Sequence, residues 1–460
     1  MKLQIKEHKL FFVFFIVIAI VYLSSFFVQH DIWWDSSVYL GMGKFLYSSG
    51  DVGLWEASRP IVQPLILGFF WKLGFDAVLL GKIIVVLFSL GIIFLTYLIA
   101  VDLFDKKIAF IASLLLSLSS TFFLFVNILH TEIPSTFFAL LGFYFFIKKR
   151  YNFSGSFLGI AFMTRFFQIF AFIPLFLLLT YLIMKKKESI NSMVMFLIFF
   201  LIPVIPYLVL NYFLYNNPFY PFLLQAFMTT HTGGNFYQPF YFYFINLVKE
   251  NILSLFSLLG LIFIFKKPNF KKISIAVVFL SVFVPYNLIA HKEMRLLIPT
   301  LPFLYILTSY GIFYFANLFK KKKVLILSLL LIVFLLFNIP KLKFEEYEDN
   351  LDVFYDYVES AKIDNGLWIS NPAFIAYSDL KSDELIYYPL YDSGKINELT
   401  GKIGNAKHVL INTCDLLPCP PKDNLCNQKN DDFLAMLEER FDLFSYEGKG
   451  QCEHYIFESG

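Results

Sequence analysis

The stretch HKEMRLLIPTLPFL, residues 291–304, places four charged or titratable side chains in its first five positions, between two long apolar segments. These segments, 273–290 and 296–318, are each close to the ~20 residues that cross ~30 Å of hydrocarbon at ~1.5 Å per residue. The stretch therefore indicates a turn at a membrane surface, and the rest of the chain can be divided from it.

The composition is that of a membrane protein. Of 460 residues, 58% are hydrophobic, 20% aromatic and only 16% charged, whereas soluble domains carry about 25% charged residues. The net charge of +3 is small, and the lysines fall in short runs between apolar blocks. This distribution argues against a nucleic-acid partner, which would require basic residues gathered on one face.

Eleven segments are predicted to span the bilayer, although 153–183 can also be interpreted as one kinked element. The stretch 60–75 is apolar but short and holds two prolines, so we expect it to be re-entrant or to lie along the outer surface, with a further span as the alternative. The predicted fold is an all-α membrane domain with about 11–13 spans. The predicted spans are 10–28, 76–101, 108–127, 133–147, 153–168, 169–183, 190–214, 251–265, 273–290, 296–318 and 324–339.

Short basic runs predict the orientation, because cytoplasmic loops carry an excess of lysine and arginine. With eleven spans, every run and the N-terminus fall on the cytoplasmic side, and the C-terminus falls outside. The first span follows a basic segment like a signal peptide, but it is long and no A-x-A site follows, so we expect a retained anchor. The runs are DKK at 105–107, KKR at 148–150, KKK at 185–187, KKPNFKK at 266–272 and KKKK at 320–323.

After a membrane domain over 1–340, residues 341–460 are predicted to form a soluble domain outside the membrane. Helix-like and strand-like segments alternate in it, which favours a small α/β fold. The predicted helices are 345–362 and 431–441, and the predicted strands are 367–370, 385–388, 407–413 and 453–459.

All four cysteines lie in this second domain, at Cys414, Cys419, Cys426 and Cys452. An even number in one polar segment indicates disulfides in an oxidising compartment, in agreement with the orientation from the lysine runs. Four cysteines allow three pairings, and we favour Cys419–Cys426 with Cys414–Cys452. A zinc site is the alternative, although the C-x4-C-x6-C spacing fits it poorly.

Acidic side chains gather in the loops on the predicted outer side, and Asp35 lies there beside Trp33, Trp34 and Tyr39. One interpretation makes Asp35 or Ser36 the N-cap of an interfacial helix, with the tryptophans as ordinary interface anchors. The other makes Asp35 a general base, with Trp34 and Tyr39 holding a sugar ring by stacking.

Two further loop positions have similar alternatives. Glu132, close to His130, is either an acid favoured at a helix start or a group that orients an acceptor hydroxyl. Arg59 is either a loop arginine at the lipid headgroups or a ligand for phosphate. Arg165 lies in an apolar stretch, where a charge costs about 2.5–3.5 kcal/mol, so it should face the protein interior or a water-filled cavity. There it is either paired with an acid to fix helix packing or a ligand for the substrate.

In the stretch 291–304, three cationic donors are available, and Glu293 can hold one of them in place. The donors are His291, Lys292 and Arg295. Arginine can bind a phosphate through two parallel hydrogen bonds, and lysine adds a point charge. The alternative is snorkelling towards headgroups, which long basic side chains do at helix ends. Because outer loops are usually depleted of basic residues, the density of charge favours an anionic ligand, and the membrane surface favours a lipid phosphate.

The same stretch resembles the His-Lys-Glu-x-Arg-Phe motif of the multispan mannosyltransferases of GPI-anchor and asparagine-linked glycan assembly, which belong to the GT-C class and use dolichyl-phosphate sugars. The first outer loop, 33–50 and 59–74, and HTEIPSTFFALLGFYFF at 130–146 resemble the wider GT-C family, which includes protein mannosyltransferases and aminoarabinose transferases. The resemblance covers about 1–340. Leu296 stands where the motif has phenylalanine, and Trp34-Asp35-Ser36 replaces a His-Pro-Asp-Glu-like stretch, which leaves the sugar and the subfamily open.

The resemblance implies a glycosyltransferase that moves a sugar, expected to be mannose, from a polyprenyl or dolichyl phosphate to an acceptor hydroxyl with inversion. Asp35 would be the general base, and Glu132 and His130 would position the acceptor. The leaving phosphate would be held by Arg295, Lys292 and His291, with Arg59 or Arg165 as helpers. No metal or cofactor is expected, although a second acid near Asp35 keeps a metal as an alternative.

A flippase or transporter for lipid-linked glycans is the main alternative function, and a polymerase of similar shape is another. A transporter should carry ionisable residues near mid-membrane on several spans, whereas here they gather at one surface. The acceptor stays open between a lipid-linked glycan, a protein and a surface polymer. We expect an archaeal plasma membrane, with a bacterial membrane or the endoplasmic reticulum as alternatives.

Overall fold

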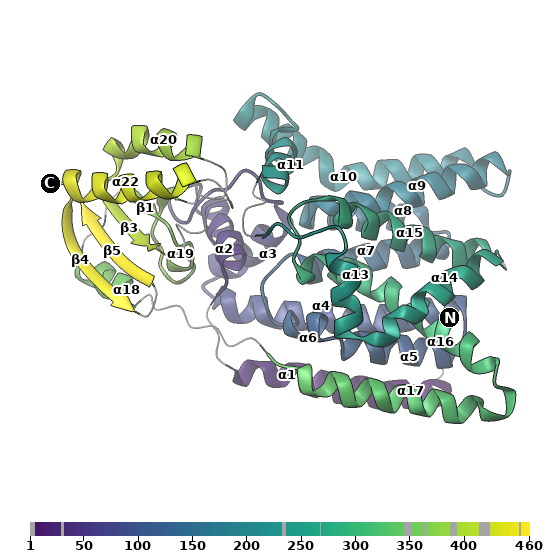
Figure 1. The fold of residues 1–460 in the computed structure, drawn as a ribbon. Helices are drawn as coiled ribbons and strands as arrows, with labels where there is room; N and C mark the ends of the chain where they lie inside the picture. Colours follow the sequence, from purple (N-terminus) through teal and green to yellow (C-terminus); the bar gives the residue numbers. More distant parts are fainter. Residues whose placement is uncertain are drawn as a thin grey trace.

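The computed structural model has two parts, a long bundle of helices and a smaller domain at one end of it that combines helices with a sheet (Figure 1). This confirms the predicted all-α membrane domain followed by a small α/β domain. The described residues are 5–28, 32–231, 236–266, 268–344, 352–361, 363, 366–386, 393–413, 424–449 and 452–460.

The bundle helices are apolar on all sides, as expected for helices that hydrocarbon surrounds. Within the described part of the chain, seven helices are long and apolar enough to cross a membrane, and all seven coincide with predicted spans. The other four predicted spans are shorter helices, and one of them is interrupted between α5 and α6. The bundle helices are α1 (Lys9–Leu23), α4 (Ala77–Leu103), α5 (Lys106–Ser117), α6 (Ser120–Leu124), α7 (Glu132–Ile147), α8 (Tyr151–Thr164), α9 (Ile169–Met184), α10 (Ile190–Tyr215), α14 (Phe256–Lys266), α15 (Phe270–Leu288), α16 (Leu301–Asn317) and α17 (Lys323–Asn338).

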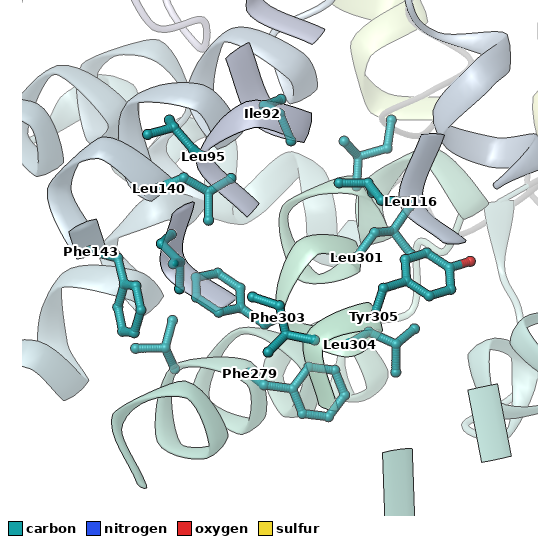
Figure 2. Packing of buried hydrophobic residues seen from close by; sticks show 14 of the residues in the cluster. Ile92, Leu95, Leu116, Leu140, Phe143, Phe279, Leu301, Phe303, Leu304 and Tyr305 are labelled. Carbon is teal, nitrogen blue, oxygen red and sulfur yellow. The ribbon is translucent and has the colours of Figure 1, made fainter. Parts of the chain in front are cut away.

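Helix α16 lies at the centre of the bundle. The span that contains it is 94% buried, whereas the span that contains α17 is 11% buried and turns its apolar side chains outwards. Figure 2 shows Leu301 and Phe303 of α16 among Leu140 and Phe143 of α7 and Phe279 of α15, all members of one buried cluster. The stretch 291–304 therefore leads directly into the core of the bundle.

The segment at 60–75 forms a short helix, α3 (Val62–Lys72). Its 11 residues would extend about 17 Å at ~1.5 Å per residue, roughly half of the hydrocarbon thickness. It packs on α2 (Trp34–Tyr47) where Gly43 and Gly68 touch, since a Cβ on Gly68 would lie 2.4 Å from the Gly43 carbonyl oxygen. Helix α3 is therefore not a spanning helix, as the first of the two interpretations expected.

The lysine runs gather at one end of the bundle. The turns from α9 to α10, from α14 to α15 and from α16 to α17 all lie at the end opposite the α/β domain (Figure 1). These turns contain three of the five basic runs in the sequence. These basic runs therefore share the end of the bundle that lies away from the α/β domain.

The α/β domain contains a five-stranded sheet with the order β2-β1-β3-β5-β4. Strand β1 pairs in parallel with β2 and β3, and β5 pairs antiparallel with β3 and β4. The predicted strands are confirmed, except that β2 begins and ends earlier than expected, and the edge strand β4 was not predicted. The elements are α18 (Asp352–Ser360), β1 (Leu367–Ile369), α19 (Ala373–Tyr377), β2 (Ser382–Leu385), α20 (Ser393–Lys402), β3 (His408–Asn412), α22 (Asn424–Arg440), β4 (Asp442–Lys449) and β5 (Cys452–Glu458).

The predicted cysteine pairing lies outside what the structure describes. Cys414 and Cys419 lie at 414–423, outside the described residues, and the side chains of Cys426 and Cys452 lie outside the description too.

The α/β domain is fixed to the bundle through α2. The Lys44 ammonium is buried and donates to the carbonyl oxygens of Ile375, Ala376 and Ser378 at the end of α19, at 3.1, 3.0 and 2.9 Å. It also lies 3.1 Å from a carboxylate oxygen of Asp379. Because helix C-termini leave carbonyls without partners, this one ammonium caps α19 and joins it to α2, the helix whose first turn contains Asp35.

Candidate active site

Asp35 lies in the first turn of α2, at the end of the bundle that carries the α/β domain. The N-cap of this helix is Trp33, and no side-chain oxygen caps it. The N-cap interpretation of Asp35 and Ser36 is therefore wrong, and the Asp35 carboxylate has other partners.

Two arginines from distant parts of the chain hold the Asp35 carboxylate. Arg59 Nη1 lies 2.7 Å from Oδ1, and Arg295 Nη1 donates to Oδ2 at 2.6 Å. Each arginine also has its own second acid: Arg59 Nε lies 3.1 Å from Glu56 Oε1, and Arg295 Nη2 donates to Glu293 Oε1 at 2.8 Å. The result is a chain of alternating charges with Asp35 in the middle.

The HKEMR segment is held in place by Phe236, which lies in the part of the chain between α10 and α14. The Lys292 amide donates to the Phe236 carbonyl at 2.9 Å, and the Phe236 ring stacks on His291 with 4.4 Å between centroids. The His291 Nε2 lies 2.7 Å from Glu293 Oε1. Glu293 thereby joins His291 to Arg295. This agrees with the prediction that Glu293 holds one of the neighbouring cations in place.

Lys292 lies away from this chain of charges. Its ammonium donates to the backbone carbonyl oxygens of Gln238, at 2.9 Å, and Ile289. The other predicted phosphate ligands line one cavity, and Lys292 is not part of its lining. These ligands are Arg59, Arg165, Arg295 and His291.

A second acidic centre lies beside the first. Glu132 is 2% exposed and its Oε1 lies 3.1 Å from Arg165 Nη1 and 3.8 Å from Arg295 Nε. Arg165 Nη1 also donates to Thr131 Oγ1 at 3.0 Å. The expectation that Arg165 faces the protein interior is confirmed, and its partner is the acid that begins α7.

The pKa values follow from this arrangement. Burial would raise the pKa of Asp35, but the positive charges of Arg59 and Arg295 outweigh burial and hold this pKa well below its usual range. Burial, and then the charge of Arg295, lower the pKa of His130 to about 4. At neutral pH Asp35 is therefore ionised and His130 is neutral, and Nδ1 of His130 can accept the hydrogen bond from Arg295 Nη1 at 3.0 Å.

The three arginines and the acids Asp35, Glu132 and Glu293 line this one cavity, which has a volume of about 440 Å³. Trp34 and Tyr39 line it, so every predicted site residue except Lys292 is brought together. Residues that the sequence did not indicate also line it, among them Gln225 and Thr229 of α11 (Tyr220–His231) and Tyr286 of α15. These side chains are neutral and lie within helices, so no charge in the sequence marks them as members of the site.

Among the described residues, no group of three or more His, Cys, Asp or Glu side chains is placed to hold a metal ion. The three carboxylates that line the cavity are matched by three guanidinium groups, those of Arg59, Arg165 and Arg295.

One family model matches part of the chain, and several solved structures match its fold. Residues 58–210 match the model of the dolichyl-phosphate-mannose-protein mannosyltransferase family, and this segment contains Arg59, His130, Glu132 and Arg165. No curated protein matches the chain by sequence.

Solved structures match over almost the whole chain. ArnT from Cupriavidus metallidurans bound to undecaprenyl phosphate has 10% identity and a TM-score of 0.66, over 99% of this chain and 98% of that one. The Archaeoglobus fulgidus oligosaccharyltransferase AglB, in complex with an inhibitory peptide and a dolichol-phosphate, has 10% identity and a TM-score of 0.62, over 98% of this chain and 74% of that one. The chain has the GT-C fold. The resemblance to the GT-C class that the sequence suggested over 1–340 is thus confirmed as a likeness of fold, and it extends into the α/β domain.

Proposed function

We propose that this protein is an integral membrane glycosyltransferase that moves a sugar from a polyprenyl or dolichyl phosphate to an acceptor hydroxyl. The observation that carries the proposal is the cavity in which the Asp35 carboxylate is held between Arg59 and Arg295. One carboxylate that can accept a proton and two guanidinium groups that can bind a phosphate lie within hydrogen-bond distance of each other. This is the combination that transfer from a lipid phosphate requires.

In this proposal the donor phosphate shares the guanidinium groups that now hold Asp35. Arg59 keeps Glu56 and Arg295 keeps Glu293 as second partners, so both can turn towards a phosphate without losing their anchors. A carboxylate released from two cations becomes a stronger base, because nearby positive charge is what keeps its pKa low. Donor binding would then both fix the leaving group and activate the base.

An apolar groove supports a lipid-borne donor. It has a volume of about 300 Å³ and runs between α9 and α15, with Phe170 and Pro174 on one side and Val277 and Ser281 on the other. The active-site cavity is lined by Phe167, which lies just before α9, and by Tyr286 of α15. The Ser281 hydroxyl donates to the Phe170 carbonyl, which Pro174 leaves without its helical donor, at 2.8 Å. The groove therefore presents apolar surface, which suits a polyprenyl chain whose phosphate lies in the cavity.

The proposed reaction is a single displacement with inversion. Asp35 accepts the proton of the acceptor hydroxyl, and the hydroxyl oxygen forms a bond to the anomeric carbon. The bond from that carbon to the phosphate oxygen breaks, and its electron pair stays on the phosphate, where Arg59 and Arg295 stabilise it. No cofactor other than the lipid-linked donor takes part.

The remaining predicted residues take supporting roles in this proposal. Glu132 and His130 position the acceptor, and Trp34 and Tyr39 contact the sugar. Lys292 keeps the backbone of the HKEMR segment in place rather than binding phosphate, because its ammonium is surrounded by carbonyl oxygens.

The donor sugar proposed is mannose, which both the HKExR motif and the matched family suggest. The proposed location is an archaeal plasma membrane with the α/β domain outside, and the acceptor is a glycan, a glycolipid or a protein. The paired acids and arginines gather in one cavity at one end of the bundle. This favours an enzyme over a flippase or transporter, in which ionisable groups are expected along the path across the membrane.

The test is transfer of labelled mannose from dolichyl-phosphate-mannose in membranes that contain the protein, beside the Asp35→Asn variant. The variant should fold, because Arg59 and Arg295 retain Glu56 and Glu293, and size-exclusion profiles check this. Transfer by the native chain that is lost in the variant supports the proposal with Asp35 as base. Transfer that survives in the variant refutes Asp35 as base. No transfer from mannose or glucose donors by the native chain contradicts the enzyme and favours a transporter.

A further inference from the structure

A second cavity, of about 490 Å³, lies at the opposite end of the bundle from the active site. It forms where α4 ends, α5 and α15 begin, and α16 turns into α17. Four lysines from three of these elements line it: Lys106, Lys107, Lys272 and Lys323.

The positive charges in this cavity are not neutralised by acids. Asp105 is the acidic residue in the lining, and its Oδ1 accepts the backbone amides of Lys107 and Ile108 at 2.8 and 3.0 Å. In the described part of the chain, no carboxylate lies within 4.0 Å of the four lysine ammonium groups. Other lysines at the same end do have acids, since Lys148 pairs with Asp102 and Lys149 with Glu188. The cavity therefore carries an excess of positive charge.

Aromatic rings hold two of these ammonium groups in place. Lys272 Nζ lies 4.7 Å from the ring centroid of Phe104 and 5.3 Å from that of Tyr310. Lys323 Nζ lies 5.3 Å from the ring centroid of Phe313. A cation over an aromatic face is oriented without losing its charge, so these lysines remain able to bind an anion.

We propose that this cavity binds the phosphate headgroup of an anionic membrane lipid. Basic pockets between transmembrane helices bind such headgroups, and a site at the end of the bundle places the phosphate at the level of the membrane surface. Beside it, Leu318 and Val324 are 65% and 77% exposed and offer apolar surface to acyl chains. The site is separate from the active site, and its occupation does not depend on the proposed transfer reaction.

Native mass spectrometry of the purified protein, titrated with phosphatidylglycerol or phosphatidylcholine, tests the proposal. We expect preferential binding of phosphatidylglycerol, and the double variant Lys272→Gln/Lys323→Gln should weaken it about 25-fold. This is about fivefold for each lysine, as about 1 kcal/mol per basic residue at an anionic surface predicts. Lys272→Arg should retain binding, because it keeps the cation.

The matched control is Lys187→Gln/Lys321→Gln, which removes two exposed lysines from the same end of the bundle but not from the cavity. It should leave phosphatidylglycerol binding unchanged. Equal losses in the two double variants would overturn the proposal, because general charge would then explain binding. An absence of preference over phosphatidylcholine would also overturn it. Displacement of the lipid by millimolar inorganic phosphate would assign the site to free phosphate instead of a lipid headgroup.

Discussion

Replacement of Arg295 by lysine tests whether sugar transfer needs both hydrogen bonds of this guanidinium or only its positive charge. Arg295 uses Nη1 for Asp35 at 2.6 Å and Nη2 for Glu293 at 2.8 Å, and it is 14% exposed. A lysine ammonium is a single point on a flexible stem and cannot serve both acids with the same geometry. Arg295→Lys therefore keeps the charge but loses at least one charged hydrogen bond.

The magnitude follows from that loss. A hydrogen bond to a charged group contributes about 1.5–3 kcal/mol, and each 1.36 kcal/mol is a factor of ten in rate. If the same geometry holds the leaving phosphate, Arg295→Lys should lower the rate of sugar transfer about 10–150-fold. The measurement is the initial rate of labelled sugar transfer from the lipid-linked donor, normalised to the amount of folded protein.

Arg150→Lys is the control, because Arg150 is an exposed arginine in the turn between α7 and α8, away from the cavity. It should transfer sugar at the native rate. If Arg295→Lys also keeps at least a third of the native rate, the two-sided contact is not needed for transfer and the reasoning fails.

Two further predictions concern stability. An unfolded histidine binds a proton below about pH 6.5, whereas His130 stays neutral in the folded protein down to pH about 4. Stability should therefore fall as pH decreases through this window, by about 2 kcal/mol at pH 5. In detergent, the unfolding temperature of His130→Asn should be less sensitive between pH 7 and pH 5 than that of the native protein, and equal sensitivity would contradict the assignment. Lys44→Met should lower the unfolding free energy by about 1–3 kcal/mol, because three carbonyls at the end of α19 lose their donor. The control Lys72→Met, at an exposed position on α3, should leave the unfolding free energy unchanged. A native melting curve for Lys44→Met would show that the cap is dispensable.

The position of Asp35 connects the two domains. Helix α2 begins at the active site and, nine residues beyond Asp35, Lys44 holds the end of α19. A rise of ~1.5 Å per residue makes this separation roughly 14 Å. Because the α/β domain packs on the helix that carries the proposed base, we interpret it as part of the support of the active site rather than as an independent appendage.

The amino-acid sequence by itself determined the membrane domain. Apolar runs of sufficient length fix spanning helices locally, since no backbone group can stay unpaired in hydrocarbon, and the lysine runs separated the two ends. The strands at 367–370, 407–413 and 453–459 followed from β-branched and aromatic residues bounded by polar turns. The edge strand β4 was not predicted, because it is formed by backbone pairing with β5 and not by an apolar face that packs in the core. Its side chains Leu443, Phe444 and Tyr446 are exposed.

The candidate site was only half visible in the sequence. Isolated charges in apolar surroundings are costly, so Asp35, Glu132, Arg165 and Arg295 could be selected one by one. Which acid meets which arginine depends on contacts across 260 positions of the chain, as between Asp35 and Arg295. Only the tertiary structure decided that Asp35 lies between two guanidinium groups and that Lys292 donates to backbone carbonyls. The physical reason is that neighbouring residues in the sequence point in different directions, and packing selects which of their side chains enters the cavity.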